Sequence, residues 1–76
     1  MTADELRQMI VDALPGARVE VSGDGDHFEA VVVSERFEGL PLVQRHQAVY
    51  AALGDAFSGA LHALSLRTLT PAEAEG

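Results

Sequence analysis

Apolar residues recur at helical spacing near the start of the chain. Before them, Thr2 and Glu5 are placed as in a capping box, in which a hydroxyl and a carboxylate satisfy the first backbone N–H groups of a helix. The apolar stripe that follows consists of Leu6, Met9, Ile10, Ala13 and Leu14. Because Pro15-Gly16 comes next, the sequence predicts an amphipathic helix that ends there.

Two segments of alternating apolar and polar residues come after this helix, which is the pattern of half-buried strands. The apolar positions are Ala17, Val19 and Val21 in the first segment and Phe28, Ala30 and Val32 in the second. The intervening range Gly23–Asp26 contains an Asp-Gly pair, a strong signal for a hairpin. We therefore expect two antiparallel strands joined by an exposed acidic loop.

A second helix is predicted from Pro41, which fits the first turn of a helix, and Gly54 marks its end. Its apolar stripe consists of Leu42, His46, Val49 and Leu53, with Val43 and Tyr50 on the flanks. Asp55 can then cap a short further helix over Ala56–Ser58.

The last part of the chain returns to a strand pattern. Leu64 and Leu66 alternate with polar residues, which predicts a third strand, and Thr70–Glu73 begins a final helical turn. The predicted core consists of Leu6, Ile10, Val19, Phe28, Val32, Val49, Leu53, Leu64 and Leu66.

These elements follow the order α-β-β-α-α-β-α within a single domain that covers residues 1–76. Helices gathered on one face of a sheet make a two-layer α+β fold. The connection between the second and third strands passes through two helices, which is long enough for a crossover. We therefore expect those two strands to be parallel and the three-stranded sheet to be mixed.

Composition narrows the chemistry. The chain has 76 residues and no cysteine, which excludes thiolate catalysis, disulfides and a cluster held by four of its own cysteines. A domain of this size buries only roughly 60% of the surface of its unfolded chain, so we expect a binding or carrier module rather than an enzyme. The sequence has neither a secretory signal pattern nor an apolar run near the ~20 residues of a membrane span, so we expect a cytoplasmic protein.

The charge is acidic, with 12 Asp and Glu against 5 arginines, no lysine and a net charge of −7. This charge disfavours binding to duplex DNA, which needs several phosphate contacts. Arg45 and Arg67 could still form a local basic patch, whereas the alternative is that the arginines make surface ion pairs.

Histidines are the candidate ligands for a borderline metal in a chain without cysteine. His62 stands at the entrance to the third strand, where it could instead be a partly buried side chain bonded to the backbone. His27 lies beside the hairpin turn, where it could instead be solvated. His46 lies on the apolar helical stripe, which favours a structural or partner-facing role over metal binding, and we expect its neighbour Arg45 to be exposed.

Several short segments, in this order and spacing, resemble the BolA family over nearly the whole chain: Val31–Ser34, Arg36–Gly39, Arg45-His46 with Tyr50, His62–Leu64 and Thr70–Glu73. The range Val21–Phe28 resembles the IbaG-like, acid-stress branch of that family. Asp24 stands where some members carry a cysteine ligand. Ala74 stands where tryptophan is usual, which predicts a short or loosely docked last helix.

The resemblance implies a class II KH-like fold and a non-enzymatic role with monothiol glutaredoxins in handling 2Fe–2S clusters. In that family the histidine before the third strand, here His62, is a cluster ligand. A second ligand comes from the loop between the first two strands, where this chain offers only His27. The glutaredoxin and its glutathione supply thiolates, so no cofactor is expected on the isolated chain. We expect partner contacts at Arg45, His46 and Arg67, with an acidic partner or glutathione bound by Arg45.

Self-association into a homodimer is left open. The KH-like fold and some family members also point to an alternative function, a nucleic-acid-binding stress regulator. KH domains clamp nucleotides with a Gly-X-X-Gly loop. The nearest segment here, Gly39–Leu42, does not fit that pattern, so this alternative ranks below the first.

Overall fold

A computed structural model describes residues 2–24, 27–54 and 63–76 of the chain. The elements in chain order are helix α1 (Ala3–Ala13), strands β1 (Arg18–Asp24) and β2 (His27–Val33), the 3₁₀ helix η1 (Glu35–Phe37), helix α2 (Leu42–Leu53), strand β3 (Ala63–Leu69) and helix α4 (Pro71–Glu75). This order agrees with the predicted one. The predicted short helix Ala56–Ser58 and its cap Asp55 lie outside the described residues.

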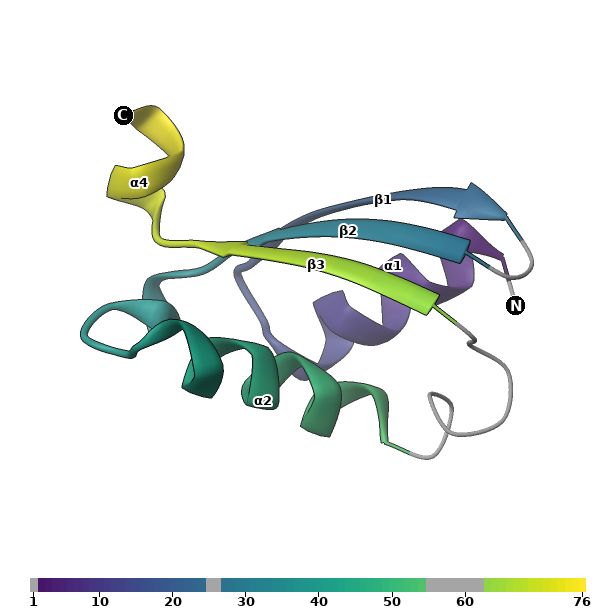
Figure 1. The fold of residues 1–76 in the computed structure, drawn as a ribbon, viewed down its shortest axis with the longest axis horizontal. Helices are drawn as coiled ribbons and strands as arrows, with labels where there is room; N and C mark the ends of the chain where they lie inside the picture. The colour runs from purple at the N-terminus through teal and green to yellow at the C-terminus, as the bar shows by residue number, and fades with distance from the viewer. Residues whose placement is uncertain (1, 25–26, 55–62) are drawn as a thin grey trace.

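The sheet is mixed, as predicted, with the strand order β1-β2-β3. β1 and β2 are antiparallel, and Asp24 pairs with His27 where the hairpin closes. β2 and β3 are parallel, with His27 opposite Ala63 at one end and Val33 opposite Leu69 at the other. Helices α1 and α2 cover the same face of the sheet, whereas α4 extends beyond the carboxyl end of β3 (Figure 1). The two-layer α+β arrangement is therefore confirmed.

The predicted capping box at the start of α1 is present. The Thr2 hydroxyl accepts a hydrogen bond from the Glu5 N–H at 3.1 Å, and the Glu5 carboxylate accepts one from the Thr2 N–H at 2.9 Å. The same exchange links Thr70 and Glu73 at the start of α4. Helix starts leave N–H groups without a partner inside the helix, so these pairs fix where α1 and α4 begin.

The core lies between the sheet and the two covering helices. Most of the predicted core is buried, while Leu64 and Leu66 are half-buried and pack against it. The prediction left out three buried apolar residues, which are Leu14, Ala30 and Phe37. Phe37 is fully buried although it lies in η1, a connection without the periodicity of a helix or strand.

Two residues of the predicted helical stripes are exposed instead of buried. Ala13 is exposed in the last turn of α1, and Leu42 is 59% exposed in the first turn of α2. The side of α2 that faces the domain runs through Arg45, Val49 and Leu53, which are spaced by four residues. Arg45 thus takes the inward position in the first turn, and Leu42 lies at the edge of the buried face.

Candidate functional site

One of the two candidate metal ligands, His27, lies at one end of the sheet. His27 is the first residue of β2, and its side chain is exposed. Its partner in the parallel pair with β3 is Ala63, the residue that follows His62 in the chain. Paired strands lie roughly 4.8 Å apart, so the backbone at His27 is close to the chain neighbour of His62. His62 itself lies outside the described residues, and its role as a ligand stays a prediction.

Among the described residues there is no group of three or more His, Cys, Asp or Glu side chains that could hold a metal ion. The chain also contains no cysteine anywhere in its sequence. Any thiolate ligand of a metal centre at the His27–Ala63 end must therefore come from another molecule.

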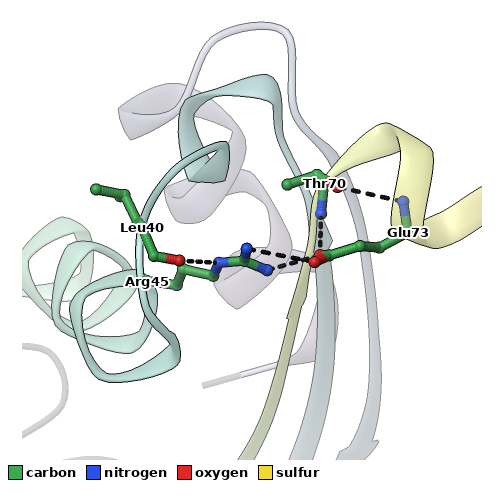
Figure 2. Close-up of polar contacts among 4 residues, drawn as sticks. All are labelled: Leu40, Arg45, Thr70 and Glu73. Carbon is green, nitrogen blue, oxygen red and sulfur yellow. Dashed lines mark hydrogen bonds and ion pairs between the residues drawn. The ribbon is translucent and has the colours of Figure 1, made fainter.

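Arg45 forms an internal ion pair, and the prediction that its side chain is exposed was wrong. Its guanidinium nitrogens Nη1 and Nη2 donate to the two carboxylate oxygens of Glu73 at 2.6 and 3.3 Å, while Nε donates to the Leu40 carbonyl at 2.9 Å (Figure 2). The Arg45 side chain is only 13% exposed, against 46% for that of Glu73. A fork-shaped guanidinium matches a carboxylate in this way, and the contact joins α2 to α4.

The ion pair changes the pKa of the Glu73 carboxyl group. The hydrogen bond from Arg45, followed by that from the Thr70 N–H, lowers the pKa of Glu73 from its ordinary value of 4.5 to about 2. Both donors stabilise the charged form of the carboxyl group. Helix α4 is short, in agreement with the expectation of a short or loosely docked last helix; it contains no buried residue, and the ion pair to Arg45 links it to α2.

His46 is half-buried, and its Nε2 atom is buried without a hydrogen-bond partner in the described part of the chain. The hydroxyl of Thr68, on the facing strand β3, is in the same condition. Because Nε2 is turned away from solvent, the ring is poorly placed to contact a partner through that atom. A partner contact through the rest of the ring stays a prediction.

Arg67 is exposed on β3 between Leu66, which packs against the core, and the buried Thr68. Side chains alternate between the two faces along a strand, so Arg67 lies on the sheet face opposite α1 and α2. Arg45, in contrast, lies in α2 and is held by Glu73. The two arginines therefore do not form one basic patch.

Large exposed apolar side chains gather on α2. The sequence pattern had put these residues on the apolar stripe of the helix or on its flanks. They are Leu42, Val43 and Tyr50, which are 59%, 66% and 38% exposed. The segment Leu42–Leu53 contains none of the 12 acidic residues of the chain. That lack of carboxylates was visible in the sequence and could have marked this helix as a contact surface. Within the described ranges, no helix is long and apolar enough to cross a membrane.

Comparison with known proteins assigns the family. The model of the BolA-like proteins matches residues 6–73 of the chain. The acid stress protein IbaG of Escherichia coli is 38% identical over 74 residues, which cover 96% of this chain and 88% of IbaG. The structure of a BolA homologue from Coxiella burnetii superposes with a TM-score of 0.91 at 45% identity, covering 100% and 99% of the two chains. The chain belongs to the BolA family.

Other relatives have names that indicate different functions. The BolA domain of SufE1 from Arabidopsis thaliana has a TM-score of 0.82 at 32% identity, with 93% of each chain covered. A protein named DNA-binding transcriptional regulator BolA, from Escherichia coli, is 42% identical over 55 residues, which are 72% of this chain and 52% of that protein. Family membership is thus compatible with more than one kind of partner.

Proposed function

We propose that this chain is a non-enzymatic adaptor in iron–sulfur cluster assembly or trafficking, and that it shares a 2Fe–2S cluster with a monothiol glutaredoxin. The observation that supports this proposal most directly is the pairing of His27 with Ala63, the residue next to His62, in a member of the BolA family. The cluster is cargo held between two proteins rather than a resident cofactor of this chain.

The ligand inventory explains why such a cluster would be shared. A 2Fe–2S cluster is held by four ligands, normally thiolates, with imidazole replacing thiolate in some centres. This chain contributes His62, with His27 as the second imidazole, and the glutaredoxin contributes its own cysteine and that of bound glutathione. Imidazole ligands make the centre less negative and raise its reduction potential. The adaptor would thereby change both the redox behaviour of the cluster and the ease with which it is passed on.

The exposed apolar face of α2, formed by Leu42, Val43 and Tyr50, is the surface on which we propose that the glutaredoxin docks. A partner can approach this face without meeting a carboxylate on α2, although the whole chain carries a charge of −7. The carboxyl end of α2 and the first residues of β2 and β3 lie at the same end of the molecule (Figure 1). Leu42 and Val43 lie in the first turn of α2, at the opposite end of that helix, so a partner must extend along α2 past Tyr50 to contact this face and reach the His27–Ala63 end together.

The direct test is to mix the chain with a monothiol glutaredoxin that carries a 2Fe–2S cluster. The proposal requires a complex with the mass of one copy of each protein and a visible absorption spectrum that differs from that of the glutaredoxin alone. The chain without a glutaredoxin serves as the control. An unchanged spectrum together with two separate proteins would contradict the proposal.

Nucleic-acid regulation is the second candidate, and the name of the DNA-binding relative favours it. The net charge of −7 opposes it, because phosphate contacts need clustered cations and Arg45 is already paired with Glu73. The segment Gly39–Leu42 also lacks the second glycine of a KH nucleotide clamp. Gel shifts at increasing salt separate the two candidates, since binding through phosphates must weaken steeply as salt rises.

A further inference from the structure

Gly23 occupies an unusual position beside the proposed cluster site. It lies in β1 with a φ of +111°, a backbone conformation that side-chain-bearing residues rarely adopt, and it pairs with Phe28 across the hairpin. A Cβ atom added at Gly23 would overlap the carbonyl oxygen of His27. It would also lie only 2.9 Å from the Phe28 Cα. The absence of a side chain therefore lets the two strands approach at the point where His27 begins β2.

Other described glycines separate the effect of φ from the effect of crowding. Gly16 and Gly39 have φ values of +89° and +80°, yet a Cβ added to either would meet nothing within 4 Å. Substitution at those positions would cost backbone strain alone. At Gly23 it would add a collision with the backbone of a candidate ligand residue.

We propose that Gly23 is a positioning residue for His27. The small size of Gly23 would let the start of β2 lie at the distance from β3 that a shared metal centre needs. The inference rests on the proposed function, because it takes His27 to be a ligand. Designed and natural sites of this kind tolerate displacements of only about 0.5 Å before binding suffers.

The direction of the displacement follows from which side of the contact is anchored. The Phe28 side chain is fully buried in the core, and so is Val32 further along the strand. His27 is exposed and is the last paired residue at this end of β2. Because β2 lies between β1 and β3, a methyl group at Gly23 would displace the backbone of His27 relative to Ala63 more readily than it would move Phe28.

The experiment compares Gly23→Ala with Gly16→Ala and Gly39→Ala as controls for backbone strain, and with His27→Ala as the reference for a lost ligand. In the protein without a cluster, NMR would follow two cross-strand contacts: that between His27 and Ala63, and that between Val19 and Val32 near the open end of the hairpin. In the complex with a cluster-carrying glutaredoxin, visible absorption would follow cluster retention.

We expect Gly23→Ala to change the His27–Ala63 contact, to keep the Val19–Val32 contact and to retain as little cluster as His27→Ala. Both control variants should keep both contacts and the parent spectrum. A His27–Ala63 contact in Gly23→Ala of the same intensity as in the parent would overturn the proposal. Loss of the whole sheet in that variant would also overturn it, because the glycine would then serve folding rather than His27.

The NMR contacts and the cluster absorbance together distinguish failure of the role of Gly23 from failure of the proposed function. If His27→Ala leaves the cluster spectrum unchanged, His27 is not a ligand, and the proposed second ligand is wrong. The positioning claim fails with it as a statement about a cluster site, but the NMR contacts still report whether Gly23 sets the place of His27. If His27→Ala loses the cluster and Gly23→Ala does not, only the role of Gly23 is refuted.

Discussion

Replacement of Phe28 by alanine should remove a large part of the stability of this domain. The Phe28 side chain is fully buried near the start of the central strand β2, opposite Gly23 in β1 and Leu64 in β3. A buried Phe→Ala change typically costs about 3–5 kcal/mol, because apolar burial is lost and a cavity remains. At about 0.05–0.15 kcal/mol per residue, a 76-residue domain has a total stability of only about 4–11 kcal/mol.

Thermal unfolding followed by circular dichroism measures this loss. For a domain of this size each 1 kcal/mol lowers Tm by about 4–8 °C, so Phe28→Ala should lower Tm by about 12 °C or more, or prevent folding. The matched control is Glu29→Ala at the next position, which is exposed and should change stability by no more than about 0.5 kcal/mol. A Phe28→Ala protein with a Tm within about 4 °C of the parent would refute the register and core described above.

Four further predictions concern the ion pair, the docking face and the ligands. Glu73 has a folded-state pKa of about 2 against an ordinary 4.5, so its stabilising effect is present above about pH 4.5 and is lost as the pH falls towards 2. Glu73→Gln should therefore lower the urea midpoint of unfolding at pH 7, and its difference from the parent should shrink between pH 4.5 and 2. Glu75→Gln is the control. A difference that does not depend on pH would contradict a stabilising Arg45–Glu73 ion pair. Val43→Asp should weaken binding of the glutaredoxin at least tenfold, or about 1.4 kcal/mol, in a calorimetric titration, and should leave Tm unchanged. Gln44→Asp, about 100° round the helix, should leave the affinity unchanged. Equal affinities for the two variants would exclude this face of α2 as the docking surface. Cluster absorbance in the complex should fall between about pH 7 and 5.5, since protons compete for imidazole ligands, whose reference pKa is about 6.5, and a pH-independent absorbance would argue against histidine ligation. His27→Cys should reduce this loss, because a metal-bound thiolate resists protonation, and superimposable pH curves for the two proteins would mean that His27 is not a ligand.

Local sequence patterns predicted most of this fold. The capping box at Thr2, the helical turn that begins at Thr70, the alternation around Phe28 and the stop at Gly54 each depend on a few neighbouring residues. Sequence spacing alone therefore identifies them. The parallel pairing of β2 with β3 followed from the length of the connection between them.

Features that depend on distant contacts were not predictable in the same way. Arg45 turns inward because Glu73, 28 residues further along the chain, offers a carboxylate beside it. The same inward position in α2 leaves Leu42 exposed. Phe37 is buried because the short helix η1 carries it into the core, and no periodic pattern surrounds it.

The candidate site was predictable only in part. Family-specific spacing singled out His62 and His27. The pairing of His27 with Ala63, the chain neighbour of His62, could not be predicted from spacing and comes from the register between β2 and β3. The assignment of partner contacts to Arg45, His46 and Arg67 stays a prediction, and Arg45 is paired with Glu73. The exposed apolar residues of α2 now appear as the better candidates for docking.

The central claim, that this chain provides a histidine ligand to a cluster shared with a glutaredoxin, is tested most directly by one comparison. The parent chain and His62→Ala are each mixed with a monothiol glutaredoxin that carries a 2Fe–2S cluster, and the visible spectrum and the mass of the complex are recorded. We predict that the parent forms a one-to-one complex with an altered cluster spectrum, and that His62→Ala stays folded but loses or strongly changes that spectrum. An unchanged cluster spectrum in the His62→Ala complex would contradict the account.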